Sequence, residues 1–179
     1  YYNFFEAPDG ESGLSIAEET MPDLIISDVI MPGINGYKVC KELKENIRTC
    51  HIPVVLLTAK NEPEHMVEGY ESGADAYVPK PFEIKVLLSN ISRLIKNREL
   101  IRNKFKEQNF MVDREADLGS KDEHFLKMVN EEIERQIKID SDFTVNKLSE
   151  IMNMSATQIY RKIKALTGFS TTEYIRTLK

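Results

Sequence analysis

Residues 23–40 read DLIISDVIMPGINGYKVC and decide the fold class of the first half of the chain. The opening run is short, β-branched and almost continuously apolar, the pattern of a strand buried on both faces of a parallel sheet. Glycine and proline mark a turn, and a helical pattern follows over 36–46. Similar apolar runs occur at 53–58 (PVVLLT) and 76–78 (AYV). The remaining helical patterns are at 11–19, 62–71 and 82–95. This alternation predicts a doubly wound α/β domain.

The ends of the three predicted strands carry complementary chemistry. Asp28, Thr58 and Lys80 each stand at or near the carboxyl end of one strand. In open α/β sheets the functional crevice lies outside these ends, so an acid, a hydroxyl and a cation would meet there. Such a set suits a phosphoryl group, because the carboxylate can attack it while the ammonium and hydroxyl contact its oxygens. Taken singly, each residue is better explained as a turn cap, a strand end or a surface lysine.

Charge is distributed unevenly along the chain. Residues 1–98 hold 10 basic and 15 acidic side chains, a net charge of −5, whereas residues 141–179 hold 6 and 3, a net charge of +3. Only the second stretch suits a polyanionic partner, although such a surplus is also common in solvated helices. Cys40 and Cys50 lack metal-ligand spacing and a disulfide framework, which favours a reducing compartment. With no apolar run of membrane-spanning length and no signal-peptide pattern, we expect a cytoplasmic segment.

The organisation of the chain changes near residue 105. A polar, charged stretch at 106–122 is the expected linker, and 123–179 has a helical apolar period without a convincing strand. We therefore expect an α/β domain at 1–105 and a small all-α domain at 123–179. The apolar stripe beyond Arg98 fits either a helix packed on its own domain or a dimerising coil.

Two short helical patterns separated by a tight break lie within residues 142–168. Thr144 is placed to cap the first helix. Ser155, with Gln158 three residues later, forms a capping box for the second, and Gly168 suits a left-handed cap at its end. The spacing therefore predicts two short helices joined by a tight turn.

The second of these helices has two distinct faces. Its apolar face carries Ile159, Ile163 and Leu166. Its polar face carries Thr157, Tyr160, Arg161 and Lys164, at i, i+3, i+4 and i+7. Arg161 can bond a guanine edge, Thr157 or Tyr160 can contact bases, and Lys164 suits a phosphate. Periodicity alone fits an ordinary amphipathic helix with a solvated basic side equally well.

The segments DLIISDVIMPGINGYKVC, HIPVVLLTAK and GADAYVPKPF together resemble the receiver domain of two-component response regulators, across residues 1 to about 105. The resemblance implies a flavodoxin-like fold and phosphorylation of Asp28. It also implies that Thr58 and Tyr77 form a switch pair, that Lys80 contacts the phosphoryl group, and that the Lys80–Pro81 bond is cis.

The same resemblance implies Mg²⁺, held by Asp28, by the backbone carbonyl of Ile30 and by acidic residues at the end of the receiver's first strand. Those acids have no counterpart in this sequence, which opens at residues 1–7 (YYNFFEA) on what looks like the receiver's second strand. We expect that the first strand and helix are missing and that the exposed sheet edges favour swapping between chains. We also expect this segment to bind little or no metal, because one carboxylate and one carbonyl hold a hard dication poorly.

The stretch FTVNKLSEIMNMSATQIYRKIKALTGFSTTEYIR at 143–176 resembles the first helix-turn-helix of an AraC-type DNA-binding domain, with coverage from about residue 123. That family normally carries two such units joined by a long helix, and only the first has a counterpart here. A single unit makes fewer phosphate and base contacts, so we expect weak and mostly non-specific DNA binding.

Together the two resemblances imply a phosphorylation-controlled transcription regulator, and they fit the carboxyl-terminal part of a hybrid protein with sensor and histidine kinase domains. Its expected partners are a histidine kinase, DNA and a second copy of the chain, with no small-molecule substrate. The receiver would catalyse its own phosphorylation and would not be an enzyme otherwise. A longer parent protein that contains this segment is compatible with a membrane anchor. The alternatives are a phosphorelay or interaction module without DNA binding and, more remotely, a nucleotide-binding enzyme, for which the sequence offers no glycine-rich phosphate loop.

Overall fold

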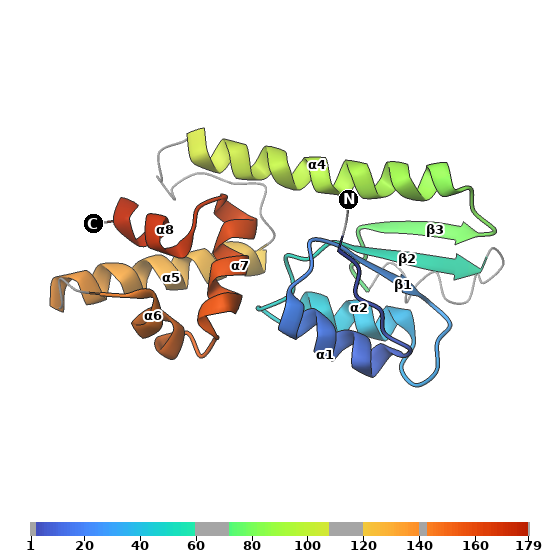
Figure 1. The fold of residues 1–179 in the computed structure, drawn as a ribbon, viewed down its shortest axis with the longest axis horizontal. Helices are drawn as coiled ribbons and strands as arrows, with labels where there is room; N and C mark the ends of the chain where they lie inside the picture. The colour runs from blue at the N-terminus through green and yellow to red at the C-terminus, as the bar shows by residue number, and fades with distance from the viewer. Residues whose placement is uncertain (1–2, 60–71, 108–119, 140–142, 179) are drawn as a thin grey trace. The chain divides into compact units, whose positions relative to one another are not determined.

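The computed structural model describes residues 3–59, 72–107, 120–139 and 143–178 (Figure 1). The chain forms two compact units, residues 1–96 and 97–179. Each unit buries its own set of apolar side chains. Helix α4, Ile84–Glu107, begins in the first unit and ends in the second.

A three-stranded parallel sheet forms the centre of the first unit. In spatial order its strands are β1 (Ile25–Asp28), β2 (Val54–Ala59) and β3 (Ala76–Lys80). Asp28 pairs in register with Leu57, and Thr58 pairs with Pro79. Because all three strands run in the same direction, Asp28 and Lys80 end at the same edge of the sheet.

Helices cover both faces of this sheet (Figure 1). α1 (Gly10–Thr20) and α2 (Gly36–Glu45) pack on one face, and the first part of α4 packs on the other. Alternate residues of β2 serve the two layers, because successive strand side chains point to opposite faces. Val54 and Leu56 join the core under α1 and α2, whereas Val55 joins Leu94 of α4. The predicted doubly wound α/β architecture is confirmed.

The predicted strands and helices of this unit agree closely with the structure except at its start. Residues 1–7 were expected to form a strand, but the described part of this stretch, 3–7, is not a strand. A strand requires a hydrogen-bonding neighbour, and no described strand pairs with these residues. Phe4 and Phe5 are accordingly 82% and 60% exposed. The helix predicted at 62–71 lies outside the described residues.

The second unit is helical throughout its described part. Its helices after α4 are α5 (Ser120–Ile139), α6 (Val145–Ile151), α7 (Ala156–Thr167) and α8 (Thr171–Thr177). Their fully or nearly fully buried apolar side chains are Phe125, Leu126, Val129, Ile133, Leu148, Ile159, Ile163, Leu166, Tyr174 and Ile175. Most of the expected linker, 108–119, lies outside the described residues, while α5 already begins at Ser120.

Capping groups define the helix-turn-helix segment. The predicted capping box at Ser155 and Gln158 is present, and Gly168 ends α7 with φ 76° in the left-handed region. Thr144 occupies the N-cap position of α6 but makes no side-chain capping bond, so the expectation that its hydroxyl caps this helix is wrong. Between α6 and α7 the chain turns at Asn153, whose φ is 50°, a conformation that asparagine tolerates better than most residues.

Candidate functional site

The carboxyl edge of the sheet brings an acid and a cation together. The Lys80 ammonium donates a hydrogen bond to Asp28 Oδ2 and forms an ion pair with it. The two side chains are 42% and 37% exposed, so the pair is open to solvent and to a ligand. The peptide bond between Lys80 and Pro81 is cis, as predicted.

The loop after β1 holds Asp28 in place. The Ile30 backbone N–H donates to Asp28 Oδ1 at 3.2 Å, and the Gly36 N–H donates to the Val29 carbonyl at 2.9 Å. A Cβ atom at Gly36 would lie 2.2 Å from the Asp28 carbonyl oxygen, a contact that backbone cannot relieve without moving. Glycine is therefore required where α2 begins directly against the end of β1.

The pKa of the Asp28 carboxyl is lowered below its ordinary value. Partial burial by itself would raise this pKa, but the hydrogen bond and the charge of Lys80, with the backbone N–H groups of Ile30 and Val29, outweigh that effect. The carboxylate is therefore ionised at neutral pH and available as a nucleophile.

Thr58 and Tyr77 lie on the two neighbouring strands. Thr58 is the penultimate residue of β2 and is partly buried. In the described part of the chain, no hydrogen bond joins Thr58 to Asp28 or Lys80. Tyr77 is 38% exposed, and its hydroxyl lies 3.2 Å from the hydroxyl of Ser72. The structure thus brings Asp28 and Lys80 into contact and leaves Thr58 and Tyr77 beside them without such a contact.

The outward face of α7 carries the second set of predicted site residues. Thr157, Tyr160, Arg161 and Lys164 are all exposed. The Lys164 ammonium donates to the Tyr160 hydroxyl at 2.7 Å and lies 5.1 Å from the centre of its ring. The opposite face is buried through Ile159 and Ile163, as predicted. One helix thus presents hydrogen-bonding and cationic groups on a single exposed face.

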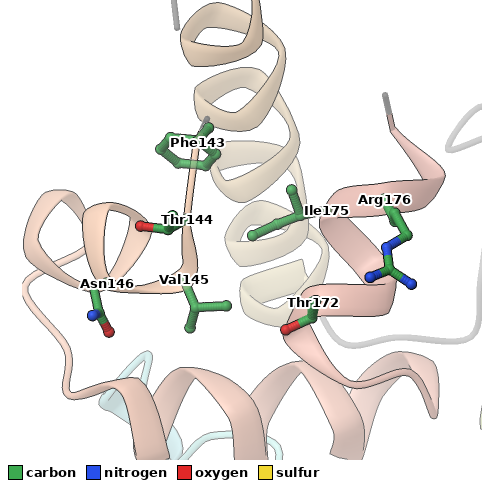
Figure 2. Close-up of a pocket in the computed structure, with 7 residues that line it drawn as sticks. All are labelled: Phe143, Thr144, Val145, Asn146, Thr172, Ile175 and Arg176. Carbon is green, nitrogen blue, oxygen red and sulfur yellow. The ribbon is translucent and has the colours of Figure 1, made fainter. Parts of the chain in front are cut away.

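A cavity of about 420 Å³ lies elsewhere in this unit. Its lining residues are Phe143, Thr144, Val145, Asn146, Thr172, Ile175 and Arg176. Figure 2 shows Ile175 of α8 projecting toward Thr144 and Val145 at the start of α6. None of the predicted site residues lines this cavity, so it is separate from the exposed face of α7.

Several polar residues that matter in the structure are absent from the sequence-based prediction. Lys162 of α7 is fully buried and forms an ion pair with Asp122 of α5 at 2.8 Å. The Tyr174 hydroxyl donates to Asn130 Oδ1 at 2.7 Å, also in the interior. A signal for the first pair exists, because Lys162 falls on the apolar stripe of its helix, three residues after Ile159 and four before Leu166.

No helix in the described ranges combines the length and the apolar character that crossing a membrane requires.

A parallel sheet between two helical layers, with an acid and a lysine joined at its carboxyl edge, defines a doubly wound α/β domain with an exposed ion pair at that edge. Residues 1–92 match the family described as the response regulator receiver domain, and the chain belongs to this family. It therefore contains a receiver domain of the two-component response regulators, followed by a helical region.

Relatives of the chain include a histidine kinase and several regulators. The histidine kinase P4 of Formosa agariphila is 38% identical over 178 residues, covering 99% of this chain and 13% of that protein. RpaA of Synechocystis sp., described as a DNA-binding dual master transcriptional regulator, is 34% identical over 62% of this chain and 46% of its own length. The chain thus spans less than two thirds of either relative.

Solved structures give the same fold. The receiver domain of a signal transduction histidine kinase from Syntrophus aciditrophicus is 38% identical, with a TM-score of 0.52, over 54% of this chain and 73% of that one. The receiver domain of a LuxO-type repressor protein from Vibrio parahaemolyticus, at 24% identity and a TM-score of 0.50, agrees in fold.

Receiver domains normally use Mg²⁺ for phosphorylation, but the oxygen donors described here do not fit the ion. No group of three or more His, Cys, Asp or Glu side chains suited to a metal occurs among the residues that the structure describes. The expected ligands Asp28 and the Ile30 carbonyl supply one carboxylate and one carbonyl, and Lys80 already pairs with that carboxylate. A hard dication needs more oxygen ligands than these.

Proposed function

We propose that this chain is part of a phosphorylation-controlled transcription regulator of a two-component system. The observation that carries this proposal is the solvent-accessible pair of Asp28 and Lys80 at the carboxyl edge of a receiver fold. Relatives named as transcriptional regulators, among them AfsQ1 of Streptomyces coelicolor at 38% identity over 71% of this chain, support the second half of the proposal.

Phosphoryl uptake would proceed by attack of one Asp28 carboxylate oxygen on the phosphorus of a kinase phosphohistidine. The new O–P bond forms as the P–N bond breaks, and the leaving imidazole nitrogen takes up a proton from solvent. Lys80 pairs with the carboxylate in the unphosphorylated structure. After phosphorylation its ammonium would contact the phosphoryl oxygens and neutralise their charge. Any Mg²⁺ bound beside Asp28 would need acidic ligands beyond the described set.

The readout would be a change of packing at Thr58 and Tyr77. Phosphorylation adds charge and acceptor oxygens near Thr58, whose hydroxyl would turn to bond them. Tyr77 would then move into the vacated space, giving up its contact with Ser72. Such a change alters the exposed surface of β3, because Tyr77 is already 38% exposed.

DNA binding would use the outward face of α7, as in the first helix-turn-helix of an AraC-type domain. Arg161 would read a guanine edge, Thr157 and Tyr160 would contact bases, and Lys164 would contact a phosphate. One reading helix makes few such contacts, so binding by this chain would be weak and mostly non-specific.

The full protein would be a hybrid that carries a histidine kinase on the same polypeptide. The support is that histidine kinase P4 of Formosa agariphila aligns with 99% of this chain, so the similarity includes both units. Dimerisation of the parent and a cytoplasmic location of these domains belong to the same proposal.

The DNA-binding half is tested by Arg161→Ala, with Arg135→Ala as the matched control. Arg135 is an exposed arginine of α5 that pairs with Glu132, so its removal takes away the same charge from the same unit. In the full-length protein we expect Arg161→Ala to weaken binding to its target duplex about tenfold and Arg135→Ala to change it little, as judged by fluorescence anisotropy. Unchanged binding by Arg161→Ala would favour the phosphorelay or interaction module instead.

The phosphoryl-accepting half is tested with the full-length protein and a radiolabelled kinase. Asp28→Asn should abolish incorporation of label into the receiver, whereas Asp23→Asn, at an exposed acid ahead of β1, should retain it. Label that persists in Asp28→Asn would place the acceptor elsewhere.

A further inference from the structure

Lys162 is a fully buried lysine in the middle of α7. Its side chain is 0% exposed, and its neighbours Ile159, Ile163 and Leu166 on the same helical face are also buried. The ammonium donates to Asp122 Oδ1 at 2.8 Å and lies 4.7 Å from the centre of the Phe125 ring. Both partners belong to α5, so the lysine crosses from one helix to the other within the core.

An ion pair at this buried position carries a free-energy cost that an apolar contact would not. Removing two charges from water carries a large desolvation penalty, and well-packed apolar residues of similar volume are often equally stabilising or better. The pair differs from an apolar contact in directionality, because it ties one atom of α7 to one atom of α5. Apolar surfaces permit small rotations and slides that this bond does not.

The orientation of α7 controls what its outer face presents. Arg161 directly precedes Lys162, and neighbouring helical residues are separated by about 100° around the axis. A rotation that displaced Lys162 would therefore turn Arg161 through the same angle. Lys164 and Tyr160 would move with it, since they share the face of Arg161.

The same helix α5 also positions α8. Asn130 accepts a hydrogen bond from the Tyr174 hydroxyl at 2.7 Å, and both residues are buried. Asp122 and Asn130 are about 12 Å apart along α5 at 1.5 Å per residue. α5 thus contacts α7 and α8 through separate directional bonds that apolar packing alone would not provide.

We propose that Lys162 and Asp122 are positioning residues that set the rotation of α7 on α5, and thereby the sequence specificity of DNA binding. This inference rests on the proposed DNA-binding function. The pair does not touch DNA itself, because Lys162 is buried on the opposite side of α7 from the exposed face.

The test replaces the pair with apolar residues of similar size, as Lys162→Met with Asp122→Leu, in the full-length protein. The probes are a duplex that the full-length wild-type protein selects from a random-sequence pool and a scrambled duplex of the same composition. Lys127→Met is the matched control, because Lys127 is an exposed lysine of α5 paired with Glu131. Thermal unfolding is measured for every variant.

We expect the double variant to unfold near the wild-type temperature, because apolar replacement of a buried pair is often neutral or stabilising. Its preference for the selected duplex should fall about tenfold, equivalent to the loss of one good base contact. Binding to the scrambled duplex and its salt dependence should persist, because the exposed cations of α7 are unchanged. Lys127→Met should leave the preference intact.

Other outcomes are equally decisive. A double variant with wild-type preference would overturn the inference, since packing alone would then suffice. If that variant does not fold, Asp122→Glu replaces it: this change keeps the charge but moves the carboxylate, and wild-type preference in the folded Asp122→Glu chain would also overturn the inference. If the full-length wild-type protein selects no duplex, the proposed DNA-binding function itself fails, and the inference fails with it.

Discussion

The two units each contain an Asp–Lys pair that joins distant parts of the sequence, 52 residues apart in the first unit and 40 in the second. Asp28 and Lys80 are 37% and 42% exposed, whereas Asp122 and Lys162 are 11% and 0% exposed. Screened charges at a surface exchange partners at little energetic cost, while buried charges cannot lose a partner without a large penalty. The exposed pair of Asp28 and Lys80 is thus suited to exchanging its partner for a ligand, and the buried pair of Asp122 and Lys162 to fixing the packing of two helices.

The largest difference is expected from removal of each acid. Asp122→Ala should destabilise the second unit by about 3–5 kcal/mol, because it leaves the Lys162 ammonium buried without its carboxylate. Asp28→Ala should change the stability of the first unit by less than about 1 kcal/mol, since its pair is exposed. Hydrogen exchange resolved by unit measures both values. Equal effects of the two substitutions would remove the distinction between the pairs.

Two tyrosine hydroxyl groups, one buried and one exposed, test whether burial alone causes the difference in stability. Tyr174→Phe should cost about 1–2 kcal/mol, because Asn130 would be left without this donor in the interior. The matched change Tyr160→Phe removes an exposed hydroxyl that Lys164 contacts, and it should cost less than about 0.5 kcal/mol. Denaturant unfolding of the two variants provides the comparison. A costlier Tyr160→Phe would show that exposure does not decide the outcome.

A smaller effect concerns the titration of Asp28. Its pKa is lowered in the folded state, so the ionised carboxylate contributes stability above the unfolded value of about 3.9. That contribution is lost as pH falls through the folded pKa. Lys80→Met should raise the pKa of Asp28 and make the first unit less sensitive to acid at low pH. The carboxyl carbon resonance of Asp28 in NMR reports the change, and an unaltered pKa would mean that Lys80 does not control it.

The smallest expected effect is that of Mg²⁺ on this chain. Asp28 and the Ile30 carbonyl do not form a sufficient ligand set, so added Mg²⁺ should leave the melting temperature of the first unit unchanged. A chelator-treated sample is the control. A rise in melting temperature that disappears in Asp28→Asn would instead show that the chain supplies further oxygen ligands.

The elements of the first unit could be predicted because their signals are local. A short apolar run gives a buried strand, and its boundary with a turn places Asp28 at the strand end. The placement of Asp28 and Lys80 at one edge also followed from sequence, since parallel strands present their carboxyl ends there. Their direct ion pair did not follow from it. The failure at residues 3–7 has the opposite cause, because a strand depends on a partner that the stretch itself does not contain.

The buried pair of the second unit could be predicted only in part. A lysine among Ile159, Ile163 and Leu166 indicates a buried cation that requires an acid. Which acid meets it depends on how α5 packs against α7, and no local pattern specifies that. Asp122 lies in the polar stretch that was expected to be a linker, whereas α5 begins at Ser120 and includes this residue. The contact between Tyr77 and Ser72 joins residues only five positions apart, but no sequence pattern predicted it.

The early start of α5 has a practical consequence for dividing the protein. A fragment cut at the expected domain boundary, residue 123, would retain α7 and its entire exposed face but would discard Asp122. In such a fragment the buried Lys162 would lack the carboxylate of Asp122, and the fragment would fold poorly. A binding assay would then report this poor folding as weak affinity for DNA. Cutting upstream of Ser120 keeps the acid, so the boundary of the excised domain, rather than the reading helix, would determine whether its binding can be measured at all.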